Sequence, residues 1–94
     1  MKLLIELPDY CAEDGFVFKW EENSWIKVVI TEDLEVHLIA NKDGLLSLAY
    51  QFLNLAQEAF PPGCDFYLTA ADALEKGSCE FWVQKTVDSP REGA

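Results

Sequence analysis

The chain has 94 residues, half of them apolar, including six Phe, three Trp and three Tyr. This predicts one small folded domain over residues 1–87 and a flexible polar tail over residues 88–94. Seventeen acidic and seven basic residues give a net charge of −10, which excludes nucleic acid and anionic lipid as partners and favours a basic partner, although acidity also serves solubility alone.

We expect four short strands before residue 41. Lys2–Leu7 is apolar up to Pro8, and Phe16–Trp20 alternates between apolar and polar side chains. Trp25–Thr31 is rich in β-branched residues, and Leu34–Ala40 alternates again. Because the strands are joined by short polar turns, we predict an antiparallel meander.

A helix follows, with Asp43 as its expected N-cap and Pro61-Pro62-Gly63 as its stop. Its apolar face is expected to hold Leu45, Leu48, Ala49, Phe52, Leu55, Ala56 and Ala59, widened by Leu46, Leu53 and Phe60. The opposite face would hold Ser47, Gln51, Asn54 and Glu58. So wide an apolar stripe is typical of a helix that lies across a sheet.

Cys64–Thr69 and Cys79–Thr86 complete the chain as a predicted hairpin. The fold class is therefore α+β: an antiparallel sheet, made of the four-strand meander and this hairpin, with one main helix packed on one face. The turn between the two strands ends in Gly77-Ser78. There the glycine would adopt a positive φ and the serine hydroxyl would bond locally.

No residue pattern predicts catalysis, a cofactor or a metal site. His37 is the only histidine, too few for a triad or a zinc site, and we interpret it as a solvated or interface residue. Acidic pairs such as Glu32/Asp33 lie in exposed turns, which is unlike a glycosidase pair. Three cysteines without Cys-x-x-Cys spacing indicate free thiols in a reducing cytoplasm. No signal peptide or membrane-spanning stretch is predicted, so we expect a cytoplasmic protein that is not an enzyme.

Aromatic residues on the polar register of the predicted hairpin form the candidate partner-binding surface. Tyr67 and Trp82 would share one face with Asp65, Glu80 and Gln84. The full candidate set is Tyr67, Trp82, Glu80, Asp65 and Asp72, followed by Trp25, Glu21 and Glu22. Two alternatives bury the same rings in a second small core or in a homodimer interface.

The segment from about Asn41 to Lys85 resembles the immunity protein 32 family of bacterial polymorphic toxin systems. The resemblance is carried by Gly44-Leu45-Leu46, Leu48-Ala49, Leu55-Ala56, Gly63, Leu68, Leu74-Glu75-Lys76-Gly77-Ser78 and Glu80-Phe81-Trp82-Val83-Gln84-Lys85. The family often has His-x-His-Leu-Asp where this chain has Asp65–Thr69, so no role of those histidines transfers. The resemblance does not extend to residues 1–40.

The resemblance implies a protein that binds and neutralises a cognate toxin, which the acidic surface suggests is a basic domain such as a nuclease. The alternative is a non-enzymatic structural or regulatory module of unrelated function, with a homodimer through the open sheet face. Neither interpretation involves nucleic acid or a membrane as the direct partner.

Overall fold

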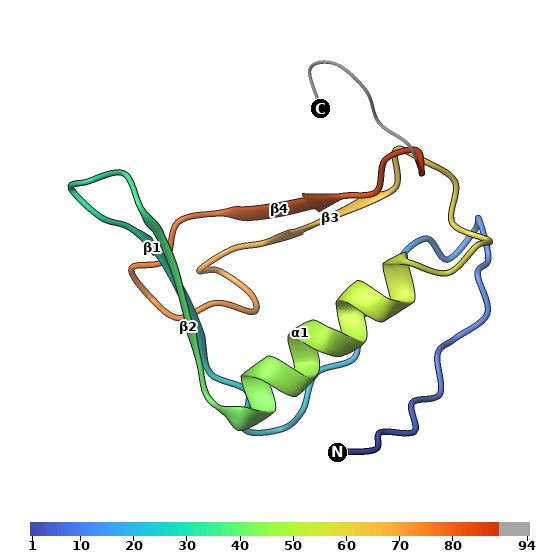
Figure 1. The fold of residues 1–94 in the computed structure, drawn as a ribbon, viewed down its shortest axis with the longest axis horizontal. Helices are drawn as coiled ribbons and strands as arrows, with labels where there is room; N and C mark the ends of the chain where they lie inside the picture. Colours follow the sequence, from blue (N-terminus) through green and yellow to red (C-terminus); the bar gives the residue numbers. More distant parts are fainter. Residues whose placement is uncertain (89–94) are drawn as a thin grey trace.

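Residues 1–88 are described by a computed structural model. Within them the chain forms one helix and four strands: β1 (Ile26–Ile30), β2 (Val36–Ala40), α1 (Lys42–Leu55), β3 (Asp65–Leu68) and β4 (Phe81–Gln84). β1 pairs only with β2 and β3 only with β4, both antiparallel, which gives two separate hairpins. In Figure 1 the β1–β2 hairpin rises from the N-terminal end of α1, and the β3–β4 hairpin runs above the helix. The α+β class is confirmed, but the predicted four-strand meander is not formed.

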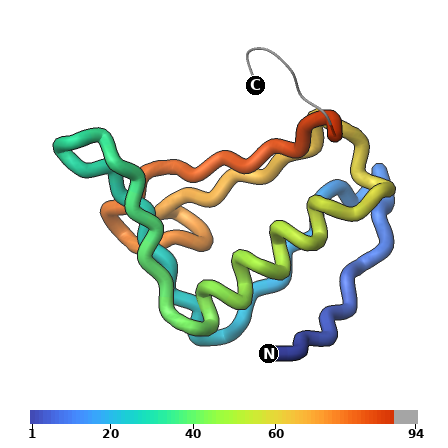
Figure 2. The backbone as a smooth tube through the Cα atoms, in the orientation of Figure 1, coloured from blue at the N-terminus to red at the C-terminus, as the bar shows by residue number. Residues whose placement is uncertain are grey.

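The two missing strands account for this difference. Lys2–Leu7 and Phe16–Trp20 were predicted as strands, but neither pairs with another strand in the described residues. The second segment instead runs as extended chain beside α1 (Figure 2). The predicted tail lies outside the described residues, except for Asp88. No helix within residues 1–88 is long and apolar enough to cross a membrane.

Side chains from both hairpins and from α1 form one core. Its buried members are Ile26, Val28, Leu48, Leu55, Phe60, Phe66, Leu68 and Leu74. The alternation predicted for the second hairpin holds, because Phe66 and Leu68 are buried whereas Tyr67 between them is exposed. Phe16 packs on this core and stacks on Phe66, with ring centroids 4.9 Å apart.

The predicted outer face of α1 is largely buried. Ser47, Gln51 and Asn54 are each at most 1% exposed. Their side chains bond the backbone of the adjoining segment: the Asn54 amide donates to Val17 O, Gln51 bonds both Lys19 N and Lys19 O, and Glu21 N donates to Ser47 Oγ. Meanwhile Leu45, Phe52 and Leu53, predicted to face the core, are exposed. The polar face was assigned wrongly because these polar groups satisfy the backbone of a segment that has no strand partner.

The start of α1 is fixed by Asn41, not by Asp43 as predicted. Asn41 Oδ1 accepts from Gly44 N at 2.7 Å and from Trp25 N at 3.1 Å. Its amide nitrogen donates to Asn23 O at 2.8 Å. An aspartate could not supply that donor, which explains why the amide side chain takes this position.

The end of α1 also differs from the prediction. The helix ends at Leu55, with Ala56 as its C-cap, before the proline pair at Pro61-Pro62. Beyond it, Lys85 Nζ donates to Gln57 O at 2.7 Å and to Phe60 O at 2.8 Å. Lys85 therefore supplies donors to backbone carbonyls after the helix and fixes the second hairpin to its C-terminal end.

The β3–β4 loop joins the second hairpin to the first. Glu75 N donates to Ile26 O and Cys79 N donates to Val28 O, each at 2.8 Å, along the edge of β1 not paired with β2. Val28 N donates to Ser78 Oγ at 3.1 Å, so the expected local bond of this hydroxyl is instead a long-range one. Gly77 adopts the predicted positive φ of 89°. The turn most specific to the family resemblance thus holds the two hairpins together.

Candidate protein-binding surface

The outer face of the β3–β4 hairpin presents an ordered pair of aromatic rings. Tyr67 and Trp82 are cross-strand partners, and their rings stack with centroids 5.7 Å apart and planes 8° apart. Both side chains are exposed, at 52% each. Trp82 Nε1 donates to Asp65 Oδ2 at 2.9 Å, which orients the indole. Rings held in place while still exposed lose little entropy when a partner covers them.

Two polar residues flank Trp82 along the chain: Gln84 lies in β4, and Glu80 immediately precedes this strand. Both are exposed, and Gln84 is the cross-strand partner of Asp65. The predicted group of Asp65, Tyr67, Glu80 and Trp82 therefore lies on one hairpin face (we call these four residues the hairpin patch). Within the described residues no second core covers the two rings, so the second-core alternative fails.

A cavity of about 460 Å³ brings the remaining acidic candidates together with one ring of the hairpin patch. It is lined by Phe18, Trp20, Glu21, Glu22, Ser24, Tyr67, Leu68, Asp72 and Ala73. Glu21 and Glu22 follow the segment beside α1, whereas Tyr67 and Asp72 belong to β3 and the loop after it. Trp25, the last candidate, does not line the cavity; it is partly exposed, and its backbone N–H bonds the helix cap.

Asp72 is held in one orientation by the turn that it closes. Its Oδ1 accepts from Thr69 N at 2.9 Å and also from Ala73 N. The bond from the Thr69 backbone, followed by that from Ala73, lowers the pKa of Asp72 below its usual value of 3.8. The carboxylate is therefore ionised at neutral pH and contributes negative charge to the cavity.

Sequence reasoning missed five residues that line the cavity, three of which bring aromatic rings or a hydroxyl: Phe18, Trp20 and Ser24. Phe18 and Trp20 stack on each other, with centroids 5.6 Å apart and planes 15° apart. Ser24 Oγ is buried and is the one such side-chain atom without a hydrogen-bond partner in the described part of the chain. The alternation of Phe16–Trp20 did mark these aromatics, but as members of a sheet.

The β1–β2 hairpin exposes an unexpected apolar surface. Val36 and Leu38 share the face of the buried Ile26 and Val28, yet both are exposed. Leu34, in the turn, is 82% exposed and adopts a positive φ of 63°, which is strained for leucine. Among residues 1–88 no strand pairs with the outer edge of β2. This hairpin is a second surface available to a protein partner.

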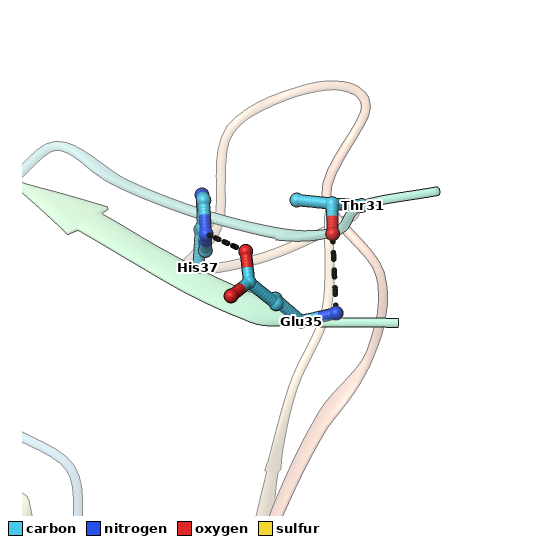
Figure 3. Close-up of polar contacts among 3 residues, drawn as sticks. All are labelled: Thr31, Glu35 and His37. Atoms are coloured by element: carbon cyan, nitrogen blue, oxygen red, sulfur yellow. Dashed lines mark hydrogen bonds and ion pairs between the residues drawn. The ribbon is translucent and has the colours of Figure 1, made fainter. Parts of the chain in front are cut away.

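His37 lies on the other face of β2, where half of its side chain is exposed (Figure 3). Its Nε2 is 3.4 Å from Glu35 Oε1, an ion pair when the imidazole is protonated, and Glu35 N donates to Thr31 Oγ1 at 3.1 Å. No group of three or more His, Cys, Asp or Glu side chains within residues 1–88 could hold a metal ion.

Comparison with known proteins adds one match. The family model described as Immunity protein 32 matches residues 35–86, more than half of the chain. No curated protein and no solved structure matches at a significant level. The matched region contains β2, α1, the β3–β4 loop and the hairpin patch, whereas Glu21 and Glu22 lie outside it.

Proposed function

The chain belongs to the immunity protein 32 family, and from that premise we propose that it binds and neutralises a cognate bacterial toxin without catalysing a reaction. The observation that carries this proposal, besides the family, is the hairpin patch: two stacked, exposed aromatic rings beside two carboxylates. Such a surface suits a protein partner better than a small molecule. We place the binding in the cytoplasm of the cell that makes the toxin.

Charge defines the kind of toxin that fits. With a net charge of −10, the chain attracts a basic domain and repels an acidic one. Nuclease toxins carry basic clefts because their substrate is a polyanion, so an acidic inhibitor can both approach and cover such a cleft. In this mechanism the carboxylates raise the association rate, and the aromatic rings, which the toxin covers in the complex, lower the dissociation rate.

A co-expression experiment tests the proposal. The toxin domain encoded beside this chain's gene should kill cells when expressed alone and spare them when the chain is present. The Trp82→Ala variant should weaken the complex by about 2 kcal/mol, roughly 30-fold in Kd, because it removes the central anchor. Gln84→Ala, on the same strand and face, is the matched control and should change Kd less than about twofold.

Two results would argue against this assignment. Unchanged toxin affinity of Trp82→Ala with a lower Tm would make the ring pair a stabilising feature of the hairpin only. Failure of the wild-type chain to protect cells or bind the toxin would reject the function itself.

The exposed β1–β2 hairpin favours a second candidate, a regulatory or structural module that self-associates. The outer edge of β2 offers unpaired backbone groups flanked by Leu38 and Ile39, both exposed. Antiparallel pairing of two such edges would bury these side chains. Light scattering across a range of protein concentrations decides: a mass that doubles in the wild type and stays monomeric in Ile39→Lys supports this candidate, and a constant monomer mass rejects it.

A further inference from the structure

The cavity lined by Glu21, Glu22, Asp72 and Tyr67 has the chemistry of a site for one cationic side chain. We infer that it receives an arginine side chain of the protein partner. The identification of the partner as a toxin rests on the proposed function. The preference of the cavity for an arginine side chain rests only on the residues that line it.

The walls of the cavity are aromatic on two sides. The stacked pair of Phe18 and Trp20 comes from the segment beside α1, and Tyr67 comes from β3. Trp82 stacks on Tyr67 and so backs that wall. A guanidinium is planar and stacks on aromatic faces, and its attraction to them grows when water is excluded. At about 460 Å³ the cavity has room for an arginine side chain.

The charge of the lining is of one sign. Glu21, Glu22 and Asp72 are the ionisable acids among the lining residues, and no lysine, arginine or histidine lines the cavity. Glu21 and Glu22 are exposed, and within residues 1–88 neither forms a salt bridge. A cation that enters the cavity would therefore meet three carboxylates as well as the aromatic walls.

A polar atom without a partner lies among the residues that line the cavity. Ser24 lines the cavity, and its Oγ is buried with no hydrogen-bond partner. A buried hydroxyl without a partner is destabilising, and a hydrogen-bonding group that pairs with it removes that penalty. Arginine brings five N–H donors in a fixed planar arrangement, more than lysine, and can bond two acceptors at once.

A small probe tests the site without any toxin. Nα-acetyl-L-arginine amide is titrated into the isotopically labelled chain and followed by NMR, beside the citrulline analogue, which has the same shape and no charge. We expect saturable shifts of the Trp20 indole N–H and the Ser24 amide, with the Ile39 amide unmoved. Citrulline should bind at least tenfold more weakly. The absence of saturable shifts, or equal binding of citrulline, overturns the inference.

Two double variants with the same charge change separate the cavity from the general acidity of the chain. Glu21→Gln with Glu22→Gln should weaken probe binding at least fivefold, whereas Glu32→Gln with Asp33→Asn, in the β1–β2 turn, should weaken it less than twofold. The first variant should still fold, because Glu21 bonds Ser47 through its backbone N–H and not its side chain. Equal losses in the two variants overturn the site.

The same variants against the toxin distinguish this inference from the proposed function. A fivefold or greater loss of toxin affinity in the Glu21/Glu22 variant alone supports the toxin arginine. Tight toxin binding that is unaffected by that variant overturns the inference and leaves the proposed function standing. A wild-type chain that binds the probe but no toxin overturns the proposed function and the toxin origin of the arginine with it.

Discussion

The segment beside α1 and the β3–β4 hairpin each form one wall of the cavity, yet they are held by different means. In the hairpin, backbone groups bond one another across the two strands. In Val17–Glu21, backbone groups bond the side chains of Ser47, Gln51 and Asn54 instead. Both segments alternate between apolar and polar residues. Alternation therefore predicts extended backbone, but not what satisfies its hydrogen bonds.

The geometry of helix and strand makes the second arrangement possible. The bonded backbone positions are two residues apart, which spans about 6.6 Å in extended chain. The helix side chains are three or four residues apart, which spans about 5 Å along α1. The spacing along the extended segment and the spacing along α1 are similar enough for three successive contacts. The face of α1 that carries the polar side chains is consequently the buried one.

The largest expected effect comes from a substitution that disrupts only the segment beside α1. Gln51 is fully buried and bonds both backbone groups of Lys19, so Gln51→Leu removes the partner of a backbone N–H and of a backbone C=O at once. We expect the free energy of unfolding to fall by about 3 kcal/mol in a urea titration. Gln84→Leu is the control, since that amide is exposed and should change the value by less than about 0.5 kcal/mol. Equal losses of unfolding free energy in both variants would show that the bonds of Gln51 to Lys19 add no more stability than the exposed amide of Gln84.

A pair of serines sharpens the comparison at a smaller scale. Ser47 Oγ accepts from Glu21 N, and Ser78 Oγ accepts from Val28 N where the second hairpin docks on β1. Each Ser→Ala change should cost about 1 kcal/mol, because one backbone N–H loses its acceptor. Amide hydrogen exchange should speed up at Glu21 in the first variant and at Val28 in the second. Faster exchange at both amides in either variant would show that the two regions open together.

The smallest expected effect concerns Asp72 and pH. The pKa of Asp72 is lowered in the folded chain, so its stabilisation is complete above the ordinary value of 3.8 and is lost as the pH falls through the lower folded value. Asp72→Asn keeps the acceptor oxygen but not the charge. Wild type should therefore be slightly more stable at pH 7, and the two unfolding free energies should approach each other as the pH falls below 3.8. A difference that is constant over this range would mean that the turn does not depend on the ionised carboxylate.

Sequence reasoning located the paired strands and the helix but not the way they assemble. Trp25–Thr31 and Leu34–Ala40 contain β1 and β2, because β-branched and alternating residues mark paired strands well. The helical wheel failed at Gln51 and Asn54, since it assumes that polar residues face water. A polar residue that bonds a distant backbone carries no local signal of that partner.

The candidate site shows the same limit. The pairing of Tyr67 with Trp82 follows from hairpin register, so it could be predicted from the sequence. The grouping of Glu21 and Glu22 with Asp72 could not, because it depends on where the segment beside α1 lies. Ser24 was missed for a further reason: an unpaired hydroxyl becomes visible only when its surroundings are known.

The salt dependence of association with the proposed cognate toxin domain tests the central claim most directly. If an acidic surface guides this chain onto a basic toxin, the association rate constant measured by stopped flow should fall at least tenfold between about 0.02 M and 0.5 M NaCl, while the dissociation rate changes little. An association rate constant that stays level across this range would contradict the account.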